Sequence, residues 1–324
     1  FKKLNLPFTR SLMFIVGTSE EGEWTDMESF RREFTIPDFS FTPDGAFPIH
    51  NIEKGYADVE ITIPLERKFG SGRSSIVELA GGDSPNTIPS TARFVYRDSR
   101  EGETVTLAGE GRSVHSSCPE QGDNAITRLA LLIRKQNLDH PALNRMMDFI
   151  GCLHGDCSGC FLGFKNDNPY YKGEYTGDTK ANPTVIRLTG EELFLNINIR
   201  HRPGATREQI EEIFHRLSKE FGFAWRIAGY QEPLYLSRDN KFFPLMNRAY
   251  EAVTGLPGSF SPAGGSSYAK ALPNCVCWGP VFPGEEDSCH RENEKMSLES
   301  ITRCIEIYGR FLFEACTGSR RQQL

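Results

Sequence analysis

Long hydrophobic runs are absent from this sequence of 324 residues. Its longest apolar stretches, residues 12–16 and 129–133, contain about five residues, whereas a helix needs roughly 20 to cross a bilayer. Runs of basic residues are absent too: 37 Lys and Arg stand against 43 Asp and Glu, a formal net charge of -6. No surface is therefore built to follow a phosphate backbone. These absences exclude a membrane-spanning protein and argue against nucleic acid as a partner.

A regular cysteine framework is also missing. The nine cysteines are odd in number and scattered, which is typical of reduced thiols rather than of a disulfide scaffold. The chain does not open with a charged region followed by an apolar one, as a signal peptide would. We therefore expect a cytoplasmic protein.

The apolar pattern changes along the chain, whose length suggests about two domains. Residues 12–16 are apolar and Gly17 ends the run, which predicts a short strand buried on both faces. From Glu53 to about residue 232, apolar and polar residues alternate in several stretches, such as 57–63 and 193–199. Such alternation is typical of half-exposed strands in an antiparallel sheet.

Helix signals complete the predicted architecture. Thr206 begins a capping box, and apolar residues then recur on one face until Gly222. Further helices are predicted over residues 124–135, 140–153, 243–254 and 297–316. We predict an α/β protein in which a discontinuous domain, residues 1–52 and 233–324, has a mixed sheet flanked by helices. An α+β domain, residues 53–232, is inserted into it.

Several polar motifs could carry chemistry. Glu20 and Glu21 directly follow the first predicted strand, Asp44 lies in a turn, and His290 lies among acidic residues. A Gly-Gly pair at 264–265 would let the backbone approach a ligand closely. Each signal is weak alone, because adjacent glutamates are common on surfaces and an Asp in a turn is usually only a turn former.

The order of these motifs resembles that of the co-catalytic zinc dipeptidases of the dipeptidase V and carnosinase type, relatives of aminoacylases and carboxypeptidase G. The resemblance covers essentially the whole chain and implies a catalytic domain with an inserted lid. The enlarged lid resembles that of the dipeptidase V subgroup and implies a monomer. The matching segments are Gly-Thr-Ser-Glu-Glu (17–21), Phe-Thr-Pro-Asp (41–44), Glu-Lys-Gly (53–55), Gly-Arg-Ser-Val-His-Ser-Ser-Cys-Pro (111–119), Asn-Ile-Arg (198–200), Gly-Gly-Ser-Ser-Tyr-Ala-Lys (264–270) and His290.

The resemblance implies a metal centre with two zinc ions. Glu20 would be the general base that takes a proton from the attacking water. Asp44 would be a ligand of the first zinc, and Glu21 and His290 would be ligands of the second. These residue types suit the metal, because zinc accepts carboxylate oxygen and imidazole nitrogen.

The resemblance also implies substrate contacts. His115 would close over the substrate with the lid and donate a hydrogen bond to the developing oxyanion. Arg200, which shares its motif with Asn198, would bind the substrate's C-terminal carboxylate bidentately; Arg202 is an alternative anchor. The same carboxylate pocket would be lined by Gly264, Gly265 and Ser267, with Ser267 in place of an expected Thr.

The family pattern is incomplete before Glu20. It also requires a His-x-Asp motif and, later, an Asp that bridges the ions, but residues 1–16 contain neither His nor Asp. Two explanations stay open: an N-terminally incomplete dipeptidase, whose upstream coding sequence supplies these ligands, or a diverged form that has lost catalysis. As given, the chain is expected to bind zinc weakly and to hydrolyse little.

Two cysteine groups were weighed as further metal sites. Cys152, His154, Cys157 and Cys160 form a compact cluster, but the second Cys-x-x-Cys half of a structural zinc site is missing, so we expect free thiols. Cys275-Val276-Cys277 is expected to lie on a strand with its two thiols on opposite faces, where they cannot chelate together.

The predicted activity is zinc-dependent hydrolysis of dipeptides with a free C-terminal carboxylate, the reaction of a metallopeptidase on a small peptide-like substrate. One alternative is an N-acyl-amino-acid deacylase of the same family, which differs in the group on the acyl side. The other is a non-catalytic dipeptide-binding homologue, which the absent ligands favour.

Overall fold

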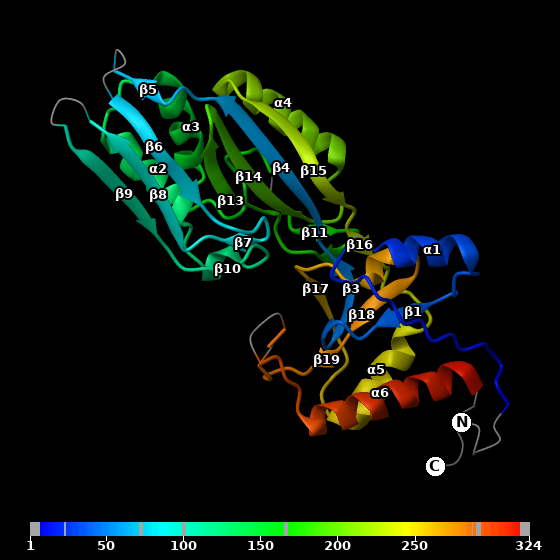
Figure 1. Ribbon diagram of the computed structural model, residues 1–324. Coiled ribbons are helices and arrows are strands. Elements are labelled where there is room, and N and C mark those ends of the chain that lie inside the picture. The colour runs from blue at the N-terminus through cyan, green and yellow to red at the C-terminus, as the bar shows by residue number, and fades with distance from the viewer. Residues whose placement is uncertain are drawn as a thin grey trace. The chain divides into compact units, whose positions relative to one another are not determined.

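The computed structural model describes residues 7–22, 24–70, 74–98, 102–164, 168–286, 288–289 and 293–317. The chain divides into two compact units (Figure 1). The first contains Phe1–Glu53 and Leu234–Leu324, and the second contains Lys54–Pro233. The change of apolar pattern at Glu53 thus coincides with a boundary between units.

A mixed sheet forms the centre of the first unit. Its strands run in the order β1 (Ser40–Thr42), β18 (Cys275–Trp278), β3 (Ile49–Glu53) and β16 (Leu234–Tyr235), and β17 (Phe260–Ala263) also pairs with β3. β1 is parallel to β18 and β17 to β3, whereas β3 is antiparallel to β18 and β16. Shorter elements are β2 (Gly45–Ala46), β19 (Pro280–Val281) and the 3-10 helix η3 (Tyr268–Ala271).

Two helices supply most of the first unit's core. α5 (Phe243–Thr254) and α6 (Leu298–Thr317) pack against each other and against the sheet, and α1 (Thr25–Glu33) follows the Glu20–Glu21 pair. Both predicted helices are confirmed, and Gly255 ends α5 with a left-handed φ of 70°. The core side chains from the sheet and these helices include Ile49, Val276, Trp278, Met246, Ile307 and Phe311.

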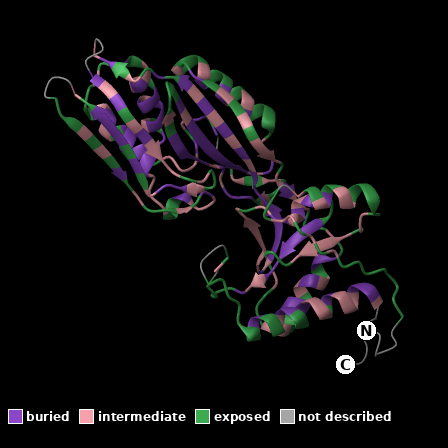
Figure 2. Ribbon diagram, in the orientation of Figure 1, coloured by how far each residue is buried: buried purple, intermediate pink, exposed green. Residues whose placement is uncertain are grey.

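The predicted strand at residues 12–16 is wrong. These residues form no strand, and among the described parts of the chain no strand pairs with them. Phe14 is 89% and Val16 is 73% exposed. The chain before α1 is drawn mostly as exposed in Figure 2. A strand exists only where a neighbour accepts its backbone hydrogen bonds, and an apolar run alone does not reveal whether that neighbour is there.

The second unit is built on one eight-stranded sheet. Its order is β15 (Ala224–Gln231), β4 (Gly55–Pro64), β14 (Glu192–His201), β13 (Lys180–Thr189), β6 (Ser74–Gly81), β8 (Thr91–Arg97) and β9 (Thr104–Glu110), with β5 (Lys68–Phe69) paired to β6. All these pairs are antiparallel. Shorter elements are β7 (Thr87–Ile88), β10 (Val114–His115), β11 (Tyr170–Tyr171), β12 (Glu174–Tyr175) and the 3-10 helix η2 (Pro119–Gln121).

Helices α2 (Ala125–Lys135), α3 (Pro141–Cys152) and α4 (Arg207–Phe221) share one continuous core with the sheet (Figure 1). The three helices were predicted, and Thr206 makes the expected capping box with Gln209. On β4 and β14, Val59, Ile61 and Ile197 belong to this core and are 0% exposed. Because successive side chains alternate between faces, the residues between them place their polar side chains on the other face.

Searching the described residues for a helix both long and apolar enough to span a membrane yields none.

The first turn of α2 offers a stability test. Asn124 caps this helix by accepting from Ile126 N at 3.0 Å and donates from Nδ2 to Pro183 O at 2.7 Å. We expect Asn124→Ala to lower the free energy of unfolding of this unit by about 1–2 kcal/mol. Chemical denaturation measures this, and Gln136→Ala at the exposed end of α2 is the control. Equal stabilities for the two variants would contradict the capping role.

Candidate functional site

Carboxylates from three distant segments meet in the first unit. Glu20 precedes α1, Asp44 lies two residues after β1, and Glu53 is the last residue of β3. Burial raises the pKa of Glu20 to about 7, helped by the negative charges of Asp44 and Glu21 and by a hydrogen bond with the Asp44 side chain. A hydrogen bond between two carboxyl groups requires one of them to hold a proton, which agrees with the raised pKa of Glu20.

Glu53 is the most buried member of the cluster, with 1% of its surface exposed. Its carboxylate accepts hydrogen bonds from Ser267 Oγ at 2.6 Å and Ser267 N at 3.1 Å. Burial raises the pKa of Glu53 to about 7, although the Ser267 hydrogen bonds and the Lys270 charge oppose that shift. Glu53 belongs to a matching segment, in which no role was assigned to it. Its only local signal was this Glu-Lys-Gly segment, 53–55.

The donor types of this cluster suit zinc, but the described residues do not complete a ligand set. Carboxylate oxygens are zinc donors, and a cation would relieve the repulsion that raises the pKa of Glu20. Within the described residues, however, no group of three or more His, Cys, Asp or Glu side chains could hold a metal ion. The predicted ligand His290 lies outside the described residues.

The structure corrects the interpretation of Cys275 and Cys277. Both lie on β18 in the same apolar cluster, because residues two apart on a strand share a face. The expectation of opposite faces was therefore wrong. Burial and the nearby Glu53 charge raise the pKa of both thiols, that of Cys275 to about 12. Within the described residues, neither thiol belongs to a group of three or more side chains that could hold a metal ion.

The loop after β17 carries the predicted carboxylate-binding residues of the first unit. Gly264 and Gly265 follow the last residue of β17, and Gly265 has no neighbouring atom that an added Cβ would meet within 4 Å. Ser267 is 2% exposed and held by Glu53, as described above. The structure thus brings Ser267 together with the acidic cluster through Glu53.

Arg200 lies in a buried polar network in the second unit. It occupies β14 and is 7% exposed. Its Nε donates to Asn198 Oδ1 at 3.0 Å, and Asn198 Nδ2 donates to Asp58 Oδ1 on β4 at 2.7 Å. The guanidinium carbon also lies 5.5 Å from the centre of the Tyr56 ring. Asp58 and Tyr56 were missed, because only strand pairing places them opposite Asn198 and Arg200.

His115 lies at the end of β10 and is exposed. Its Nδ1 lies 2.7 Å from Ser117 Oγ and accepts from Ser117 N at 3.2 Å. A ring that accepts at Nδ1 carries its proton on Nε2 when neutral. The local geometry therefore makes Nε2 a hydrogen-bond donor, as an oxyanion-stabilising role requires.

The Cys152, Cys157 and Cys160 thiols form no disulfide. The neighbouring His154 places its Nδ1 3.0 Å from Thr127 Oγ1. Free thiols in this cluster stay a prediction.

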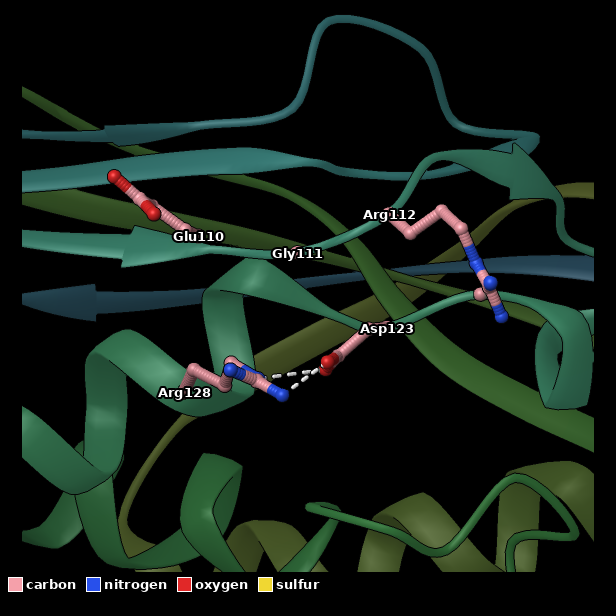
Figure 3. A pocket seen from close by; sticks show the side chains of 6 residues that line it. Glu110, Gly111, Arg112, Asp123 and Arg128 are labelled. Carbon is pink, nitrogen blue, oxygen red and sulfur yellow. Dashed lines mark hydrogen bonds and ion pairs between the residues drawn. The ribbon is translucent and has the colours of Figure 1, made fainter.

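A separate depression of about 440 Å³ lies on the second unit (Figure 3). Its lining consists of Glu110, Gly111, Arg112, Gly122, Asp123 and Arg128. Arg128 is already paired with Asp123, with Nε donating to Oδ1 at 2.7 Å. The two acidic and two basic side chains balance, and none is a predicted site residue, so this depression does not support a functional assignment.

This chain is similar to curated proteins with dipeptidase names and to a solved dipeptidase structure. "Putative dipeptidase YtjP" of Bacillus subtilis is 26% identical over 339 residues, which cover 97% of this chain and 71% of that protein. "Putative dipeptidase SSP1012" of Staphylococcus saprophyticus is 25% identical, with the same coverage. Aminoacylhistidine dipeptidase from Vibrio alginolyticus shares the fold, with a TM-score of 0.55 and 13% identity over 90% of this chain and 67% of that one.

The family assignment rests on a further match. The profile described as Peptidase family M20/M25/M40 matches residues 1–314. This match confirms both the resemblance stated from the motifs and the α/β fold class. The chain is a peptidase that belongs to family M20/M25/M40.

Proposed function

We propose that this protein is a metallodipeptidase that hydrolyses dipeptides with a free C-terminal carboxylate. The observation that supports this proposal most is that Glu20, Asp44 and Glu53 come together from three distant segments in a chain of this peptidase family. The dipeptidase names of its relatives support the substrate class. A dipeptide substrate also fits the buried Arg200, because a guanidinium group can bind a terminal carboxylate through two parallel hydrogen bonds.

Zinc is the proposed metal, with Asp44, Glu21 and His290 as the ligands that this chain contributes. When bound, zinc would supply the Lewis-acid chemistry that activates water and polarises a carbonyl group. Glu20 would accept the proton of the attacking water and return it to the leaving amine. His115 would donate from Nε2 to the developing oxyanion, and Arg200 would pair with the substrate carboxylate.

A binding experiment tests the metal assignment without requiring activity. We expect calorimetry with zinc to show binding to the parent protein and weaker binding to Glu21→Ala and Asp44→Ala, since each loses a carboxylate ligand. Glu28→Ala, which removes an exposed carboxylate on α1, is the matched control. Equal zinc affinity for all four proteins would reject Glu21 and Asp44 as ligands.

Arg200 determines the predicted preference for a free carboxylate. We expect Arg200→Ala to reduce kcat/KM for a free dipeptide by about 10- to 100-fold, the usual loss of a charged hydrogen-bonded contact. The rate on the C-terminally amidated dipeptide should change little. Kinetics on both substrates measure this difference.

Arg202→Ala is the matched control, because Arg202 lies two residues further on and donates from Nη1 to the backbone oxygen of Asn168. If Arg200→Ala keeps the parent's ratio of free to amidated cleavage while Arg202→Ala loses it, Arg202 is the anchor instead. Including N-acetyl amino acids in the assay distinguishes a deacylase, which would prefer them to dipeptides.

A non-catalytic dipeptide-binding protein is the second candidate. It is favoured because, within the described residues, no group of three or more His, Cys, Asp or Glu side chains could hold a metal ion. Calorimetry with a dipeptide in metal-free buffer separates the two functions. A binding protein keeps its affinity there, whereas a hydrolase that needs zinc to hold its substrate does not.

A further inference from the structure

The turn that carries Glu20 and Glu21 is held by two side chains outside it. The Oδ2 atom of Asp26, on the first turn of α1, accepts from Thr18 N at 2.7 Å and from Ser19 N at 3.2 Å. Tyr268 donates its hydroxyl to the same Oδ2 at 2.6 Å and accepts from Ser19 N at 3.0 Å. Two consecutive backbone amides of the turn, those of Thr18 and Ser19, thus donate hydrogen bonds to Asp26 and Tyr268. We call these two side chains the clamp.

The ring of Tyr268 is also packed into the turn. A Cβ added to Gly17 would lie 2.2 Å from Tyr268 Cε2, so only glycine lets the ring lie against this backbone. On another side, the ring meets Trp24 edge-on with centroids 5.7 Å apart. Trp24 Nε1 in turn donates to the backbone oxygen of Glu20 at 2.7 Å. The turn is therefore held at Thr18, Ser19 and Glu20.

The charges of the site explain why such anchoring is needed. Glu20 is close enough to Asp44 for a hydrogen bond, and the charges of Glu21 and Glu53 also act on it. When both carboxyl groups are charged they repel each other, so the turn then stays beside Asp44 only if other contacts hold it. The clamp supplies such contacts, because its oxygen atoms accept hydrogen bonds from backbone amides of the turn.

The clamp also joins the turn to the predicted carboxylate pocket. Ser267 is bonded to Glu53, and the next residue, Tyr268, is bonded to Ser19 and Asp26. Two adjacent residues therefore fix the turn and the end of β3 relative to each other within the first unit.

We propose that Tyr268 and Asp26 are positioning residues that hold the Glu20 turn in its reactive geometry. This inference rests on the proposed function for its catalytic consequence, but the anchoring of the turn does not depend on it. A displacement of about 1 Å of a catalytic group can cost on the order of 100-fold in rate, so loss of the clamp acts on kcat rather than on substrate binding.

Tyr268→Phe tests the clamp, since phenylalanine keeps the ring against Gly17 and Trp24 and removes only the hydroxyl. With zinc-loaded protein we expect kcat to fall by about 10- to 100-fold while KM changes by less than about twofold. Hydrogen exchange of a peptide covering residues 17–22 should become about tenfold faster, because the amide of Ser19 loses an acceptor.

Two further variants make the test specific. Tyr308→Phe is the matched control: it loses one tyrosine hydrogen bond in the same unit, from the hydroxyl to Trp278 O at 2.9 Å, and should change neither readout. Asp26→Ala should reproduce the effects of Tyr268→Phe, and Asp26→Asn should partly restore the parent values because its amide oxygen still accepts.

The outcomes separate this inference from the proposed function. Unchanged exchange at residues 17–22 in Tyr268→Phe overturns the clamp, and faster exchange with unchanged kcat overturns the positioning role. If the parent protein hydrolyses no dipeptide, the proposed function fails, and the exchange experiment still decides whether Tyr268 and Asp26 hold the turn.

Discussion

Glu20→Gln is expected to lower kcat for dipeptide hydrolysis by on the order of 10²- to 10⁴-fold, the contribution of a positioned general base. Glutamine has the same shape and keeps hydrogen bonding to Asp44 possible, but its amide cannot take a proton from water. KM should stay within about twofold, because Glu20 is not a proposed substrate contact. Steady-state kinetics on the zinc-loaded enzyme measure both values.

The stability of the same variant provides an internal check. The folded pKa of Glu20, about 7, lies above the usual carboxyl value of 4.5. Charging this group therefore costs folding free energy as the pH rises through that interval. In metal-free buffer above pH 7, Glu20→Gln should be at least as stable as the parent in denaturant unfolding. A variant that loses activity together with stability would point to misfolding, and a variant with parental kcat would reject Glu20 as the base.

His115→Ala has the second-largest expected effect, a fall in kcat of on the order of 10²- to 10³-fold, the usual loss for one oxyanion donor. The Ser117 contacts keep the proton of the neutral ring on Nε2, so the ring is prepared to donate. Alanine removes that donor and leaves the general base in place. The zinc content should be unchanged, because His115 is not a proposed ligand.

His215→Ala controls for the removal of a histidine, since His215 is exposed on α4 in the same unit. It should keep the parental kcat. The oxyanion role is contradicted if His115→Ala also keeps it, or if that variant loses zinc in proportion to its activity.

Helices α2 to α6 could be predicted because their signals are local, whereas α1 was not predicted. At the start of α4, the side chains of Thr206 and Gln209 each accept a hydrogen bond from the other's backbone amide. Gly255 takes the left-handed conformation that ends α5. Such contacts join residues within four positions of each other and are readable in any fold. The alternation on β4 and β14 was readable for the same reason, because its period of two is a property of the strand itself.

The expected strand at residues 12–16 failed because strand pairing is not local. An apolar run permits a strand, but only a neighbouring strand supplies the hydrogen bonds that make one. Burial cannot be read from a run of apolar residues either, and Phe14 remains 89% exposed.

The same division applies to the candidate site. Glu20, Glu21, Asp44, His115 and Arg200 were predicted as site residues because their motifs are contiguous in the sequence. Glu53, Asp26 and Tyr268 were assigned no role there, because their importance comes from partners far away: Ser267 lies 214 positions from Glu53, and Tyr268 lies 242 positions from Asp26.

The sequence by itself thus determined helices α2 to α6, the alternating strands and the family of chemistry, all of which depend on neighbouring residues and on motifs. Only the tertiary structure decided which carboxylates are buried together and what holds them there. The physical reason is that burial and charge repulsion depend on distances in space, and those distances arise when segments more than 200 residues apart pack against one another.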